Sequence, residues 1–103
     1  MQSVDHLLKR QSELKKGILA NLDLLMGSVV KAPSHSGYYL TDKAEGKTVT
    51  RYVRKDWVST VSAMTRRSRT VRKLTRELSK INWELLRRRQ TQSATGRRVA
   101  RGA

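Results

Sequence analysis

Apolar residues recur at seven-residue intervals in the second half of the chain, and this repeat constrains the fold more than any other feature. The repeat consists of Trp57, Met64, Val71, Leu78 and Leu85, with Leu74 and Ile81 at the complementary positions. Alternating steps of three and four residues are typical of a coiled-coil seam. We therefore predict a long helix over residues 56–90, about 50 Å in length. Another surface must cover its seam, so we predict an oligomer or partner contact at Val71, Leu74, Leu78, Ile81 and Leu85.

The seam weakens toward the start of this helix, where Thr60 and Arg67 occupy the matching positions. Val58 and Val61 instead suggest that the first turns pack against a sheet. Trp57 is expected in the core, because large aromatic side chains bury the most apolar area.

A second amphipathic helix is predicted near the N-terminus, over residues 3–27. Its apolar residues follow helical spacing: Val4, Leu7, Leu8, Leu14, Ile18, Leu19, Leu22, Leu25 and Met26. Ser3 or Asp5 can cap its start, and Gly27 can end it in a left-handed conformation. Gly17 lies inside the helix and marks either a kink or a close contact.

The segment between the two predicted helices has the residue pattern of β-strands. Residues 38–41 and 48–53 are aromatic and β-branched, and the loop between them contains Gly46. This pattern predicts a β-hairpin, with a possible third strand near 28–32. A hairpin alone is marginal in water, so it must pack against a helix or a partner.

A chain of 103 residues with five aromatic residues forms one domain with a thin core. We predict an α+β fold over residues 1–90, with an N-terminal helix, a hairpin or three-stranded antiparallel sheet, and a long coiled-coil-like helix. The two helices are expected to pair by their apolar stripes, and the remaining seam is expected to form the oligomer or partner contact. Residues 91–103 have no apolar period and are predicted to be a disordered basic tail.

The positive charge of the chain is concentrated in its C-terminal half. Residues 55–103 carry eleven Arg and three Lys against three acidic residues, so they hold +11 of the net +15. On the long helix the basic residues recur at three- and four-residue steps and form a stripe away from the apolar seam. The main predicted nucleic-acid contacts are Arg66, Arg67, Arg69, Arg72, Lys73, Arg76 and Lys80. A flexible second set consists of Arg87, Arg88, Arg89, Arg97, Arg98 and Arg101.

A charged stripe on a helix is often only its solvated face. Here Glu77 and Glu84 are the only acidic residues after Asp56, so the stripe repels itself unless a polyanion lies along it. Arginine dominates, and its planar fork suits phosphate. Trp83 lies on this basic face and, with Tyr38 and Tyr39, is a candidate for base stacking, although packing against the first helix or a second subunit is the alternative for Trp83.

Catalytic and metal-binding patterns are not found in the sequence. There is no Cys, and His6 and His35 lack partners at metal-ligand spacing. No Ser-His-Asp set or paired acids in an apolar setting are evident. We expect no enzymatic activity, no metal and no cofactor. No long apolar run or signal peptide is evident, and we expect a cytoplasmic, nucleoid-associated protein that does not bind membranes.

Several short motifs resemble a known family. They are Gly27-Ser28-Val29-Val30, Gly37-Tyr38-Tyr39-Leu40, Gly46-Lys47-Thr48, Arg51-Tyr52-Val53, Trp57-Val58 and the helical stretch 78–86. Over roughly residues 25–87 the chain resembles a family of short basic prokaryotic proteins of unknown function, found near transposases and other mobile-element genes. That family usually has a Cys cluster in the loop before the Gly-Tyr-Tyr strand, whereas residues 31–36 here contain none. The resemblance implies an accessory role in nucleic-acid transactions.

These observations together predict a non-catalytic DNA-binding accessory protein of a mobile element or of a recombination or transposition complex. Double-stranded DNA, held mainly by its phosphates, is the favoured ligand. The expected protein partners are a second copy of the chain, a recombinase or a transposase. Two alternatives remain: a subunit that binds structured, guide or ribosomal RNA, and a coiled-coil adaptor that binds a partner protein.

Overall fold

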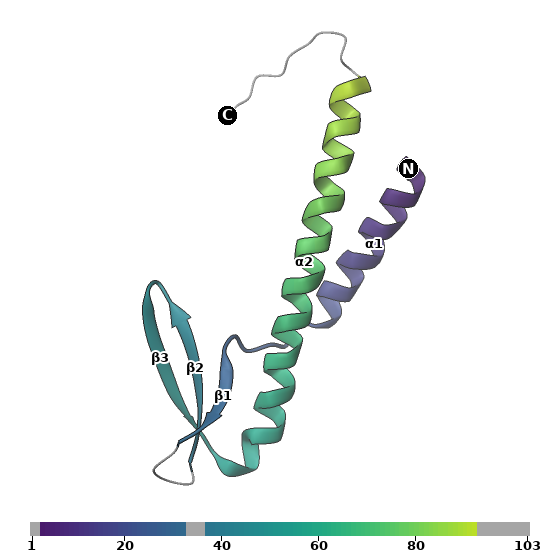
Figure 1. Cartoon of the computed structure of the whole chain (residues 1–103). Coiled ribbons are helices and arrows are strands. Elements are labelled where there is room, and N and C mark those ends of the chain that lie inside the picture. Colours follow the sequence, from purple (N-terminus) through teal and green to yellow (C-terminus); the bar gives the residue numbers. More distant parts are fainter. Residues whose placement is uncertain (1–2, 33–36, 93–103) are drawn as a thin grey trace.

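A computed structural model describes residues 3–32 and 37–92 of the chain, with side chains described as far as residue 89 (Figure 1). Its elements in order are α1 (Val4–Ala20), β1 (Ser28–Lys31), β2 (Tyr38–Ala44), β3 (Lys47–Val53), a 3-10 turn (Lys55–Trp57) and α2 (Val58–Gln92). The predicted α+β architecture is confirmed, including the third strand. The long helix begins two residues later than predicted, after the 3-10 turn, and continues to Gln92. The predicted disordered tail falls largely outside the described residues.

The three strands form an antiparallel sheet in the order β1-β2-β3. The hairpin is tighter than predicted, because its strands extend to Ala44 and from Lys47 and leave a turn of only two residues. Glu45 and Gly46 both have positive φ, 53° and 78°. A type I′ turn requires this conformation, and its twist matches that of the strands it joins.

One face of the sheet packs on the first turns of α2 and forms the core there. Leu40 and Val53 from the sheet are buried with Val61 from α2, and Val58 packs against this cluster, as predicted. Trp57, expected in the core, is instead 49% exposed, and the Arg54 guanidinium lies 5.0 Å from its ring centroid. The 3-10 turn places the indole ahead of the helix, so it does not follow the heptad repeat onto the packed face.

Helix α1 is shorter than its apolar pattern predicted. Ser3 caps it, as expected, by accepting a hydrogen bond from the His6 amide. The helix ends at Ala20, not near Gly27, because Asn21 caps its end and donates from Nδ2 to the Gly17 carbonyl. The following chain crosses α2, where the Leu25 amide donates to the Met64 carbonyl. Apolar residues after Ala20 therefore belong to this crossing segment and not to a helical stripe.

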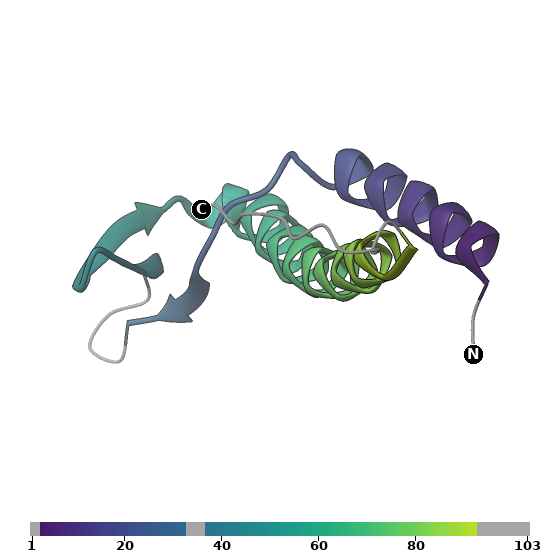
Figure 2. The same ribbon diagram turned by 90° about the horizontal axis from the view of Figure 1, so that it is seen from above.

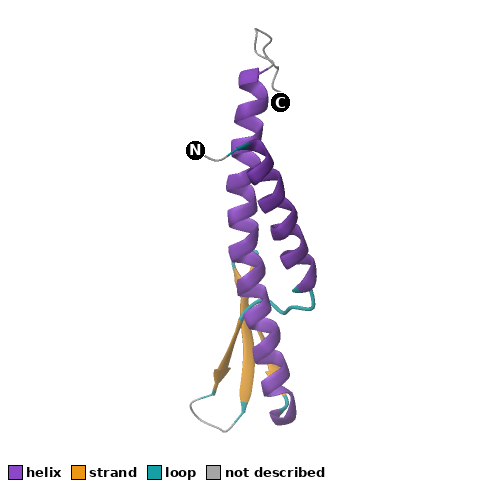
Figure 3. Cartoon of the chain, turned by 90° about the vertical axis from the view of Figure 1, so that its right-hand side faces the viewer, coloured by secondary structure: helices purple, strands orange, loops and turns teal. Residues whose placement is uncertain are grey.

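Helices α1 and α2 lie side by side and run in opposite directions (Figures 1 and 3). Leu7 and Leu14 are the most deeply buried side chains of the described residues. Gly17 marks a close contact, because a Cβ atom there would lie 3.0 Å from Cδ1 of Leu74. Seen from above, α1 and the sheet flank α2 (Figure 2). They lie along different parts of its length, so the chain is elongated, 66 × 28 × 19 Å in extent.

Candidate nucleic-acid interface

Six basic side chains project from α2 into solvent along one side of the helix. We call this set the basic face: Arg66, Arg69, Arg72, Lys73, Arg76 and Lys80. All six are exposed, and none forms a salt bridge with another described residue. From first to last they span about 21 Å of helix, at ~1.5 Å per residue. The structure thus presents a row of cations spaced a few ångströms apart along a rigid rod.

The carboxylates of α2 are engaged by other arginines. Arg10 of α1 donates two hydrogen bonds to Glu77, at 2.8 and 3.0 Å. These bonds lower the pKa of the Glu77 carboxyl, and attraction to Lys80 and Lys73 acts in the same direction. The positive charge of Arg10 offsets that of Glu77, so the pair as a whole adds no net negative charge beside the basic face.

Glu84 is held in a similar way within α2. Arg88 donates to it at 2.9 Å and Arg87 at 3.2 Å. Both hydrogen bonds lower the pKa of the Glu84 carboxyl, with that from Arg88 contributing most. Both carboxylates of the long helix are therefore paired with arginines outside the basic face. The electrostatic field along the basic face remains positive.

Four of the predicted contact residues interact with other residues of the chain. Arg67 is half-buried and donates to the Asp23 carbonyl at 3.1 Å, so it anchors the segment after α1. Arg88 is mostly buried against Glu84, and Arg87 shares that carboxylate. Arg89 lines a groove near the N-terminus of α1 and also has a partner. The remaining three, Arg97, Arg98 and Arg101, lie outside the described residues.

The candidate stacking residues point to three different places. Trp83 is 63% exposed, so the structure does not bury it against α1. Its position, three residues after Lys80, puts the indole beside the basic face. Tyr38 lies on the inner side of the sheet with the core cluster. Tyr39 lies on the opposite side, where it meets Tyr52 edge-to-face with ring centroids 5.8 Å apart.

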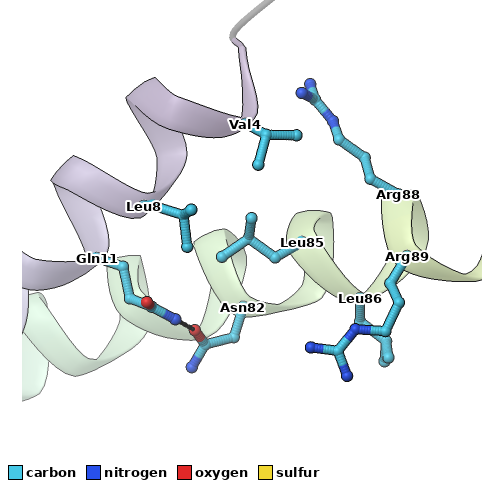
Figure 4. A pocket seen from close by; sticks show the side chains of 8 residues that line it. All are labelled: Val4, Leu8, Gln11, Asn82, Leu85, Leu86, Arg88 and Arg89. Atoms are coloured by element: carbon cyan, nitrogen blue, oxygen red, sulfur yellow. Dashed lines mark hydrogen bonds between the residues drawn. The ribbon is translucent and has the colours of Figure 1, made fainter.

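The predicted partner seam is partly covered by α1 of the same chain. Val71, Leu74, Leu78, Ile81 and Leu85 are all half-buried. Near the N-terminus of α1 the two helices diverge and leave a groove of about 640 Å³ (Figure 4). Its apolar side chains come from both helices: Val4, Leu8, Leu85 and Leu86. Gln11 and Asn82 close one end with a 2.8 Å hydrogen bond.

Sequence reasoning missed the pairs that join the two helices, Arg10 with Glu77 and Gln11 with Asn82. These residues are 67 and 71 positions apart, and no local pattern links them. Tyr52 was not among the predicted stacking residues, although it is the more exposed of the two paired tyrosines. Its alternation with Val53 on a half-buried strand is the signal that places it outward.

Within residues 3–32 and 37–92, no group of three or more His, Asp or Glu side chains is arranged to hold a metal ion. None of the helices in this part of the chain is long and apolar enough to cross a membrane. No protein-family model, curated protein or solved structure matches the chain.

Proposed function

We propose that the chain is a non-catalytic DNA-binding protein that holds the phosphate backbone of a duplex along the basic face of α2. One observation carries the proposal: six exposed cations follow one side of a long helix while both carboxylates of that helix are held by other arginines. Duplex DNA carries about one charge per 1.7 Å of its axis, so a face of about 21 Å meets several phosphates at once. The resemblance to proteins found near transposases adds an accessory role in a recombination complex.

The salt dependence of binding tests this proposal directly. If all six side chains neutralise phosphates, log affinity falls against log salt concentration with a slope of about −5. A triple variant, Arg69→Gln, Lys73→Gln and Arg76→Gln, removes half of the face and should reduce the slope by about 3 units. A labelled duplex followed by fluorescence anisotropy at several salt concentrations gives both values.

A matched variant separates the basic face from net charge. Lys9, Lys15 and Lys16 are exposed on α1, and replacing all three by Gln removes the same charge from another surface. This control should retain most of the slope. A flat titration of the unmodified chain, or equal losses in the two triple variants, would contradict the proposal.

RNA is the alternative polyanion, because a basic helix also suits an A-form backbone. Competition between a duplex DNA and an RNA hairpin of equal length decides between them. A clear preference for the hairpin would replace DNA with RNA as the ligand.

The groove between α1 and α2 favours a second candidate function, an adaptor that binds a partner protein. Val4, Leu8 and Leu86 remain exposed there beside the partly covered seam. Leu86→Asp would abolish such binding without disturbing the buried contacts between the helices. If this variant abolishes activity in cells and the basic-face variant does not, the protein acts as an adaptor.

A further inference from the structure

The outer face of the sheet, which points away from α2, carries a row of apolar and aromatic side chains across all three strands. Val30, Tyr39 and Tyr52 are directly paired in the strand register. Side chains alternate between the faces of a strand, and their neighbours Val29, Leu40 and Val53 belong to the core side. Tyr39, Tyr52 and Val30 therefore form a continuous outer row.

Most of this row is open to solvent. Tyr52 is 62% exposed, Val30 is exposed as well, and Tyr39 is half-buried. The two tyrosine rings meet edge-to-face at an interplanar angle of 70°. Gly37 lies beside them, since a Cβ atom there would be 3.5 Å from Tyr52 and 3.6 Å from Tyr39. A larger side chain at this position would pack against both rings, whereas glycine adds no side chain beside them.

The surroundings of the tyrosines suit a nucleic acid strand. The next row outward consists of Ser28, Thr41 and Thr50, whose hydroxyls can donate or accept hydrogen bonds. Lys43 follows on the same face, about 13 Å along β2 from Tyr39 at ~3.3 Å per residue. Asp42 is the only carboxylate within the three strands, and it alternates to the inner side, where it lines a cavity with Leu40.

We infer that this outer face is a second binding site, which stacks the unpaired bases of a single-stranded nucleic acid on Tyr52 and Tyr39. Exposed aromatic side chains on neighbouring strands bind successive bases in this way, because every base offers a flat π surface. Lys43 supplies a cation for the backbone phosphate. The site lies on the sheet, apart from the basic face of α2, so the protein contacts duplex backbone and unpaired bases with different surfaces.

The test uses the full chain and two single-stranded probes of equal charge. One is an oligothymidylate of about 12 nucleotides, within the span of a small single-strand-binding fold. The other is an oligomer of the same length with abasic sites throughout. Stacking predicts that the abasic probe binds about 10-fold more weakly or worse. Equal affinity for the two probes would overturn the inference, because phosphates alone would then explain binding.

Substitutions locate the site on the sheet. Tyr52→Thr keeps a residue that favours strands and should weaken oligothymidylate binding about 10-fold, whereas Tyr52→Phe keeps the stacking ring and should bind like the unmodified chain. Gly37→Leu retains both tyrosines, covers them and should also weaken binding. Tyr38→Leu is the matched control, because it removes a tyrosine from the inner face.

Circular dichroism establishes that each variant is folded before its binding is compared. Folded Tyr52→Thr and Gly37→Leu variants that bind oligothymidylate as tightly as the unmodified chain would overturn the inference. If Tyr38→Leu weakens binding as much as Tyr52→Thr, the outer face is likewise not the site.

The two proposals fail in different experiments. Substitutions on the outer face should leave the affinity for a duplex unchanged, and the triple variant of the basic face should reduce it. If oligothymidylate binding depends on Tyr52 but duplex binding does not change with salt, the stacking site stands and the proposed function fails. If duplex binding falls with salt but oligothymidylate binding does not depend on Tyr52, the proposed function stands and the stacking site fails.

Discussion

Leu14 is the residue whose truncation tests most directly whether α1 packs on α2. It is 1% exposed and shares a helix face with Arg10 and Gly17, which both contact α2. Leu14→Ala removes about three methylene equivalents, worth ~0.8 kcal/mol each on burial. An incompletely collapsed cavity raises the cost to about 3–4 kcal/mol. A domain of this size is stable by only about 5–15 kcal/mol, so a single truncation removes a large share.

Urea unfolding followed by circular dichroism measures this loss, because most of the described residues are helical. With a slope of about 1.5 kcal/mol per M, a loss of 3 kcal/mol lowers the midpoint by about 2 M. Leu19→Ala is the matched control: Leu19 is on the same helix but 71% exposed, and its truncation should cost less than about 0.5 kcal/mol. Equal midpoints for the two variants would refute the packing of α1 on α2.

Three further substitutions probe the turns and the link between the helices. Glu45→Asn should stabilise the hairpin by about 0.5–1 kcal/mol in urea unfolding, because Asn tolerates the positive φ of this position better than Glu; a loss of stability would contradict the turn geometry. Gly27→Ala should destabilise by about 1–3 kcal/mol or more, since its Cβ would lie 2.3 Å from the Thr41 carbonyl oxygen at a φ of +119°; thermal melting checks this, and an unchanged melting temperature would refute the close contact. The hydrogen bonds from Arg10 lower the pKa of Glu77 in the folded state, so their stabilisation is present above the usual Glu pKa of about 4.3 and is lost as pH falls through the lower folded value. Urea midpoints between pH 7 and pH 3 should therefore fall more steeply in the unmodified chain than in Glu77→Gln, and parallel curves would contradict the ion pair.

Residues with a strong local pattern were predicted correctly. The heptad repeat from Val71 to Leu85 gave the long helix, and the alternation around Tyr39 gave the strands. The predictions were wrong where apolar residues at helical spacing lie outside a helix. Leu25 follows helical spacing but lies in the segment that crosses α2, and only its hydrogen bond to Met64 reveals this.

The residues of the candidate interface also fall into those that local spacing predicted and those that it did not. Spacing alone identified the row from Arg66 to Lys80, because residues three and four apart share a helix face whatever the tertiary structure. Arg67 was also predicted as a contact, although its heptad position lies on the seam, and in the structure it donates to the Asp23 carbonyl. Whether a cation is available to a ligand depends on which neighbours reach it, and those neighbours are distant in sequence.

The sequence by itself determined the two amphipathic helices, the hairpin and the concentration of positive charge on the long helix, since each depends on residues close together in the chain. Only the tertiary structure decided which part of the seam α1 covers, that Arg10 engages Glu77, and that Tyr39 and Tyr52 share the outer face of the sheet. The physical reason is that these contacts join segments far apart in sequence. Their geometry is fixed by packing between helices and by strand register, which composition and periodicity do not specify.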